Sequence, residues 1–147
     1  MAKILSIATL GLSLALSNIA SAETAVTVKG DDTMRFDTTE ITAKVGEKIT
    51  LTFENVGKLP KVAMGHNLVV LKPGSDIAAF AMAAMKAKDT EYVPTGEEKA
   101  LVVAATKVLG PGETDSLEFT PTEAGEYPFL CSFPGHFSIM QGKIIVK

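Results

Sequence analysis

The chain has 147 residues and a formal net charge of −3 at pH 7, from 14 Lys and Arg and 17 Asp and Glu residues. This mildly acidic balance argues against nucleic-acid binding, because domains that bind nucleic acids carry a basic surface. The chain has only one cysteine, Cys131, which excludes an internal disulfide.

Residues 1–22 have the pattern of a secretory signal peptide. Lys3 gives a basic start, an apolar run follows, and a small-x-small cleavage motif stands at residues 20–22. A membrane anchor is the alternative, but the apolar run is short for a span and no charges that would stop transfer follow it. We therefore predict an exported mature protein of residues 23–147, located in a bacterial periplasm and without a membrane span.

Short segments rich in Val, Ile, Thr and Phe dominate the mature chain, and Gly, Pro, Asp and Asn separate them. Many of them alternate apolar and polar residues, which is typical of half-buried strands. The segments are 25–30, 40–55, 66–71, 99–109, 115–120, 125–131 and 142–147. We expect one all-β domain, an antiparallel β-sandwich of seven or eight strands with Greek-key connections.

One segment, residues 75–88, departs from this pattern. It is rich in Ala and Met, has an acid near its start and ends in lysines. These features favour a helix, since Ala and Met are good helix formers and the charges complement the helix dipole. We predict one helix inserted between two strands.

The segment LCSFPGHFSIM, residues 130–140, gathers the chain's cysteine, one of its two histidines and a methionine. Cys131 ends a predicted strand, in which Tyr127 and Phe129 share its face and Pro128 indicates an edge or a bulge. His136 and Met140 lie in or beside the loop that leads to the next strand. This loop can bring a sulfur, an imidazole and a thioether around one point.

These donors suit copper better than other metals. A thiolate, two imidazoles and a weak, distant thioether form the trigonal site of electron-transfer copper proteins. The second imidazole must come from His66, the other histidine in the chain. Gly65 precedes it, and its carbonyl could approach a metal closely because no side chain intervenes.

Other interpretations compete with a copper site. Structural zinc takes four strong ligands and has no use for a thioether, and a Cys131–His136 nucleophile pair on one tight loop is an unusual geometry. Met64, Met82 and Met85 could indicate a copper carrier, although methionine packing is the commoner role. Taken singly, each candidate ligand is more often an ordinary packed or exposed residue.

The sequence resembles the azurins, small blue copper proteins of the cupredoxin type found in bacterial periplasms. The resemblance runs from about Glu23 to Lys147. It rests on CSFPGHFSIMQGKIIVK (131–147) and KLPKVAMGHN (58–67), supported by GDDTMRFDTTEIT (30–42) and TKVLGPGETDSLEF (106–119). It implies one type 1 copper per chain, with strong ligands and weak axial ligands. The strong ligands are His66, Cys131 and His136, and the weak ones are the Gly65 carbonyl and Met140.

The resemblance also implies a function and a set of supporting residues. It implies a one-electron carrier rather than an enzyme, with Asn67 and Ser132 linking the ligand loops and the Phe133 N–H donating to the Cys131 sulfur. Redox proteins such as a c-type cytochrome or a reductase would dock at an apolar patch around His136. The patch comprises Met34, Leu59, Met64, Phe133 and Pro134. For Met34 and Leu59 ordinary core packing remains open, and a copper storage or delivery protein remains the alternative function.

The sequence departs from the azurin pattern in three respects. Azurins usually have a disulfide, which one cysteine cannot form, and many bury a tryptophan where Leu68 stands. Azurins often also have a further histidine near the copper, and the segment FENVGKLP, residues 53–60, has none. None of these differences removes a predicted copper ligand.

Overall fold

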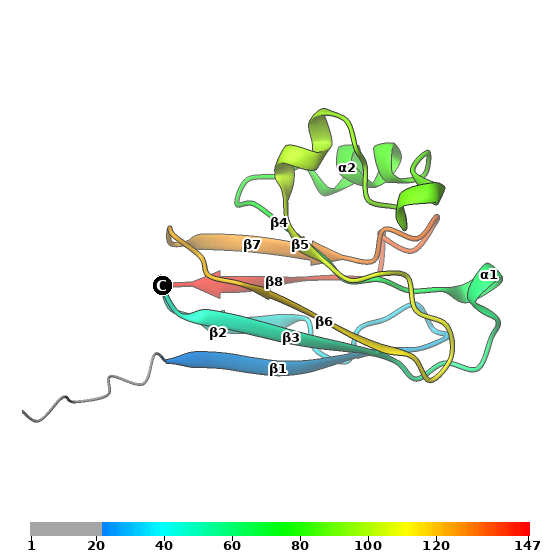
Figure 1. The fold of residues 1–147 in the computed structure, drawn as a ribbon, viewed down its shortest axis with the longest axis horizontal. Coiled ribbons are helices and arrows are strands. Elements are labelled where there is room, and N and C mark those ends of the chain that lie inside the picture. The colour runs from blue at the N-terminus through cyan, green and yellow to red at the C-terminus, as the bar shows by residue number, and fades with distance from the viewer. Residues whose placement is uncertain (1–21) are drawn as a thin grey trace, which may run out of the picture.

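The computed structural model describes residues 22–147 (Figure 1). The predicted signal peptide therefore lies outside the described residues, apart from Ala22, and stays a prediction. The described chain contains eight strands in two sheets, with short helices between them. The strands are β1 Glu23–Gly30, β2 Glu40–Ala43, β3 Lys48–Asn55, β4 Val69–Leu71, β5 Val102–Ala105, β6 Thr114–Phe119, β7 Gly125–Leu130 and β8 Gln141–Val146.

The two sheets confirm the predicted β-sandwich. One sheet has the strand order β1-β3-β6 and the other β2-β8-β7-β4-β5. The expectation that all neighbouring strands are antiparallel is wrong, because β1 pairs with β3, and β2 with β8, in parallel. The chain leaves β1, crosses to the other sheet for β2 and returns for β3, so β1 and β3 run in the same direction.

The sandwich core follows from the alternation in the strands. In β3 the side chains of Ile49, Leu51 and Phe53 are fully buried, and the residues between them are half-buried. They pack in one cluster with side chains of the facing sheet, including Phe129 and Ile144. Full burial of each such side chain stabilises the fold by about 1.5–3 kcal/mol relative to exposure.

The predicted helix at 75–88 forms, but it is shorter than expected. Helix α2 runs over Ile77–Ala84, and the Asp76 side chain caps it by accepting the Ala79 N–H at 3.0 Å. After Met85 the backbone tightens, since the N–H groups of the next two residues bond to carbonyls three residues back. Two turns of 3-10 helix follow, η1 at Lys88–Thr90 and η2 at Glu97–Leu101.

Helix α2 covers the outer face of the five-stranded sheet above β4 and β7 (Figure 1). Phe80, Ala81 and Ala84 of the helix are buried against Leu71 and Leu130. The remaining short helix, α1 at Lys61–Met64, lies just before His66 and contains no buried residue. Among residues 22–147 no helix is both long and apolar enough to cross a membrane.

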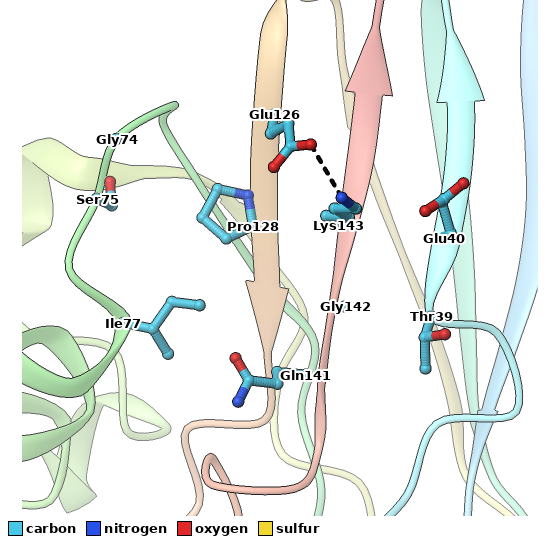
Figure 2. A pocket seen from close by; sticks show the side chains of 10 residues that line it. All are labelled: Thr39, Glu40, Gly74, Ser75, Ile77, Glu126, Pro128, Gln141, Gly142 and Lys143. Atoms are coloured by element: carbon cyan, nitrogen blue, oxygen red, sulfur yellow. Dashed lines mark hydrogen bonds and ion pairs between the residues drawn. The ribbon is translucent and has the colours of Figure 1, made fainter.

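Pro128 was expected at an edge or a bulge, but β7 is an inner strand between β8 and β4. The pairing of β7 with β4 stops at Phe129, so Pro128 has a neighbouring strand only on the β8 side. A shallow hollow of about 530 Å³ opens there, with the ion pair of Glu126 and Lys143 (2.9 Å) on its floor (Figure 2). No His, Cys or Met lines it.

Candidate metal centre

The turn between β7 and β8 carries three of the predicted site residues. The Cys131 N–H donates to the Met140 carbonyl at 2.9 Å, which closes the turn into a loop directly beyond the two strands. Inside the loop the N–H groups of Ile139 and Met140 donate to the His136 carbonyl at 3.2 and 2.9 Å. Gly135 has φ of +84°, a left-handed conformation that glycine adopts without strain. The loop thereby turns His136 back toward Cys131.

His66 reaches the same point from a different part of the chain. It lies between α1 and β4, where it exchanges two backbone hydrogen bonds with Leu109 at 3.1 and 2.7 Å. Gly65 beside it is buried, and a Cβ there would stand 2.6 Å from a Val108 methyl and 2.7 Å from the Lys61 carbonyl. Glycine is therefore required at position 65 by lack of space.

The structure brings His66, Cys131 and His136 together in one buried cluster. The two imidazole Nδ1 atoms lie 3.1 Å apart, and the Cys131 sulfur lies 3.9 Å from Nδ1 of His66 and 3.6 Å from Nδ1 of His136. A cation at the centre, with bonds of about 2.0–2.3 Å to nitrogen and sulfur, produces a triangle of this size. The donor set therefore fits one metal ion.

In the metal-free protein, burial keeps the side chains of His66, Cys131 and His136 uncharged near neutral pH. It raises the pKa of the Cys131 thiol to about 12, while the backbone N–H groups of Asn67 and Phe133 act in the opposite direction. Burial lowers the pKa of His136 to about 4, and the nearby His66 adds to this effect. Burial also lowers the pKa of His66. A bound cation would supply the charge that a buried thiolate lacks.

Met140 is fully buried, and its main chain lies beside Cys131. The end of its side chain extends to β1, because a Cβ on Gly30 would stand 2.5 Å from the Met140 methyl. This places the thioether in the interior beside the cluster-bearing loop. The axial roles expected for Met140 and for the Gly65 carbonyl stay predictions.

The predicted link between the ligand loops is present. The Asn67 amide donates to the Ser132 hydroxyl at 2.9 Å, and the Ser132 N–H donates to the Asn67 side-chain oxygen at 2.8 Å. Two further partners were missed from the sequence, since Asn67 also donates to the Glu91 carbonyl at 2.9 Å and the Ser132 hydroxyl to the Tyr92 carbonyl at 2.7 Å. Both acceptors are backbone atoms, which every residue type carries, so no sequence signal marks them.

The predicted apolar patch is partly exposed. Leu59 is 45% exposed, so the core-packing alternative is wrong for it, whereas Met34, Met64 and Phe133 are half-buried and Pro134 is exposed. The sequence did not single out Val62 of α1, which is 85% exposed. His136 is only 3% exposed, and the centre of its ring lies 4.9 Å from the centre of the Phe133 ring, so the two rings pack together.

A hollow of about 390 Å³ lies beside the Phe133 ring. Val62, Tyr92, Val108 and Phe133 provide its apolar wall, and Lys61, Lys88 and Glu91 provide its charged groups. The surface beside Phe133 therefore combines an apolar wall with two basic groups and one acidic group.

Comparisons with known proteins place the chain in a family of copper-binding proteins. Residues 22–147 match the family model described as "Copper binding proteins, plastocyanin/azurin family". The chain is 47% identical over 124 residues to the azurin of Alcaligenes faecalis, covering 81% of this chain and 94% of that one. It is 43% identical over 131 residues to the azurin of Pseudomonas chlororaphis, covering 86% of this chain and all of that one.

Solved structures of an azurin and of an auracyanin have a similar fold. An azurin (Az-iso2) from the methylotroph Methylomonas sp. strain J superposes with a TM-score of 0.74 at 33% identity, covering 84% of this chain and 98% of that chain. Reduced auracyanin from Roseiflexus castenholzii superposes with a TM-score of 0.75 at 32% identity, over 86% and 98% of the two chains. The chain belongs to the plastocyanin/azurin family of copper-binding proteins.

Proposed function

We propose that this protein is a periplasmic one-electron carrier that cycles one type 1 copper between Cu(I) and Cu(II). The observation that carries the proposal is the buried triangle of one thiol sulfur and two imidazole nitrogens. His66, Cys131 and His136 would be the strong ligands, and Met140 and the Gly65 carbonyl the weak axial ones. Soft sulfur donors combined with imidazole are the set that suits copper in electron transfer.

The protein contributes a fixed geometry and the exclusion of water. The bound copper supplies the one-electron chemistry. The residues that carry the three donors are 0–3% exposed. The hydrogen bonds between Asn67 and Ser132 join the loops of His66 and Cys131. A site that cannot rearrange favours rapid electron exchange, because the ligands need not move when the charge on the metal changes.

The same burial supports a carrier over the two alternatives. An enzyme needs an open coordination position that its substrate can reach, whereas the three residues of the triangle are only 0–3% exposed. A copper storage or delivery protein needs donors that a partner can reach. Met82 of α2 and Met85 directly after it are exposed, at 56% and 40%. Among the described residues, however, the triangle is the only cluster of His, Cys or acidic side chains that could hold a metal.

Electrons would enter and leave through His136 and the Phe133 ring that packs against it. The partner would be a periplasmic redox protein, such as a c-type cytochrome or a reductase, that docks on the apolar surface of Leu59, Val62, Phe133 and Pro134. The signal-peptide pattern in the sequence of residues 1–22 supports a periplasmic location.

Repeated redox cycling tests a carrier against a storage or delivery protein. Purified mature protein loaded with one copper should be reduced and reoxidised through many cycles while a Cu(I) chelator is present. A carrier retains the metal in both oxidation states, so its visible absorption returns after each cycle. Loss of copper to the chelator in the first reductions would favour storage or delivery instead.

A further inference from the structure

Glu91 and Tyr92 have a backbone conformation that is unusual for residues with large side chains. Both have φ of 58°, and among the described non-glycine residues only Met34 also has a positive φ. The left-handed region costs energy for residues with a Cβ, and such conformations persist only where the surroundings over-determine them. The contacts of Glu91 and Tyr92 therefore indicate what holds the pair in place.

The backbone carbonyls of this pair complete the hydrogen bonds behind the ligand loops. The Glu91 carbonyl accepts from the Asn67 amide at 2.9 Å, and the Tyr92 carbonyl accepts from the Ser132 hydroxyl at 2.7 Å. Asn67 directly follows one ligand residue and Ser132 directly follows another. With these two acceptors, both amide hydrogens of Asn67 and the hydroxyl hydrogen of Ser132 have partners. Without them, one amide hydrogen of Asn67 would be unpaired, and the Ser132 hydroxyl would keep only its longer bond to the Asn67 side-chain oxygen at 3.3 Å. Both changes are unfavourable for buried groups.

The Glu91 side chain anchors the pair to the segment that supports His66. Its carboxylate accepts the Val108 N–H at 2.7 Å. The next residue, Leu109, is bonded to the His66 backbone in both directions. Glu91 thus touches the His66 side of the site at two points, through its carbonyl and through its carboxylate.

The Tyr92 side chain reaches the third ligand. Its ring packs edge-on against Phe133 at 5.2 Å between centroids, and Phe133 in turn lies against His136. Together, Glu91 and Tyr92 therefore contact residues that lie next to each of the three donors, in the chain or in space.

We propose that Glu91 and Tyr92 form a positioning strap, which sets the separation of the His66 and Cys131 loops for one copper ion. The strap acts through Asn67 and Ser132 and does not itself touch the metal. The role toward copper rests on the proposed function, whereas the effect on the two loops does not.

Replacing the anchor tests the strap. In metal-free Glu91→Ala, the amide hydrogen of Ser132 should exchange with solvent at least about tenfold faster than in the wild type, as expected for loss of roughly one net hydrogen bond. In the copper-loaded variant, the visible spectrum and the reduction potential should shift. Glu91→Gln should stay close to wild type in both measurements, because its amide oxygen can still accept the Val108 N–H.

Glu113 offers a matched control on the neighbouring segment. Its carboxylate accepts the Gly110 N–H, also at 2.7 Å, but it makes no bond to Asn67 or Ser132. Glu113→Ala should leave Ser132 exchange, spectrum and potential unchanged.

The strap is wrong if Glu91→Ala leaves Ser132 exchange unchanged, if Glu113→Ala accelerates it equally, or if Glu91→Gln behaves like the alanine variant. Should Glu91→Ala not fold, Glu91→Asp replaces it, since the shorter acid strains the same bond and a wild-type exchange rate there would equally reject the strap. A third outcome separates the two proposals. If Glu91→Ala exchanges faster but the wild-type protein forms no blue copper centre, the proposed function is rejected and the effect of the strap on the loops stands.

Discussion

The two histidines face each other through the same ring atom, with their Nδ1 nitrogens 3.1 Å apart. In the metal-free protein, one of these nitrogens can carry a hydrogen that the other accepts. Both nitrogens point toward the same small region between the rings. The other ring nitrogen of His66, Nε2, is buried without a hydrogen-bond partner among the described residues. Buried polar atoms normally find partners, but a metal held at Nδ1 would supply none for Nε2. The proposal that these imidazoles bind a metal therefore rests on the two facing Nδ1 atoms and the nearby Cys131 sulfur.

Met140→Leu and His66→Ala should separate a weak ligand from a strong one. Met140→Leu should keep the copper and its blue colour but raise the reduction potential, because loss of a weak donor and added apolar bulk favour the less charged Cu(I). Each tenfold change in the relative preference for Cu(I) corresponds to about 59 mV. Voltammetry of the loaded variant measures this shift.

His66→Ala should instead weaken copper retention by more than about 100-fold, since even the loss of an outer partner commonly costs about 10–100-fold. Metal retention after dialysis against a chelator measures it. The assigned roles would be reversed if the Met140 variant lost its copper while the His66 variant kept it.

Among the elements, α2 allows a clean test of whether a helix outside the site affects the copper centre. Its cap residue, Asp76, holds the Ala79 N–H at the far end of the helix from η1. Asp76→Ala should lower the free energy of unfolding by about 1 kcal/mol. It should not alter the copper spectrum, because the helix end nearer the strap is unaffected. Urea unfolding and a visible spectrum check both parts, and a changed spectrum would show that α2 as a whole governs the site.

The sequence predicted the strands well where one face is buried. The alternation of β3 and the buried residues of β7 follow directly from side chains that point to opposite faces. The parallel pairs β1–β3 and β2–β8 could not be predicted in this way, since alternation reports which face is buried and not which strand lies beside it. The early end of α2 was missed because Ala, Met and Lys favour a helix well beyond Ala84.

The candidate site also contains residues that the sequence could predict and residues that it could not. His66, Cys131 and His136 could be found because their side chains carry the chemistry, and the Asn67–Ser132 link was expected from the resemblance to azurins. Glu91 and Tyr92 act on that link through backbone carbonyls from 24 and 40 residues away. Only the fold brings those atoms to the site, so the sequence could not reveal them.

For the whole molecule, the buried histidines predict how the stability of the metal-free protein depends on pH. In the fold the pKa of His136 is lowered to about 4, and that of His66 is lowered too, whereas both lie near 6.5 in the unfolded chain. The unfolded chain therefore binds more protons in this range, and protons favour it. The stability is fully present above about pH 6.5 and is lost as the pH falls toward about 4.

Urea unfolding of metal-free protein between pH 7 and pH 5 measures this dependence. The lower limit avoids most of the carboxylate titration, which begins near about pH 5. The unfolding midpoint should decrease steadily over this range. A midpoint that stays constant would mean that the two imidazoles accept protons as readily in the fold as in the unfolded chain, and hence that they are not buried as described.

The most direct test of the copper assignment is a titration of purified mature protein with Cu(II), followed by visible absorption and electron paramagnetic resonance. The wild-type protein should turn intensely blue and saturate at one copper per chain, because a buried thiolate bound to Cu(II) gives strong charge-transfer absorption. Cys131→Ser should show no blue colour even if it still binds copper through His66 and His136. A Cys131→Ser variant as blue as the wild type, or a wild-type protein that stays colourless with one copper bound, would contradict the assignment.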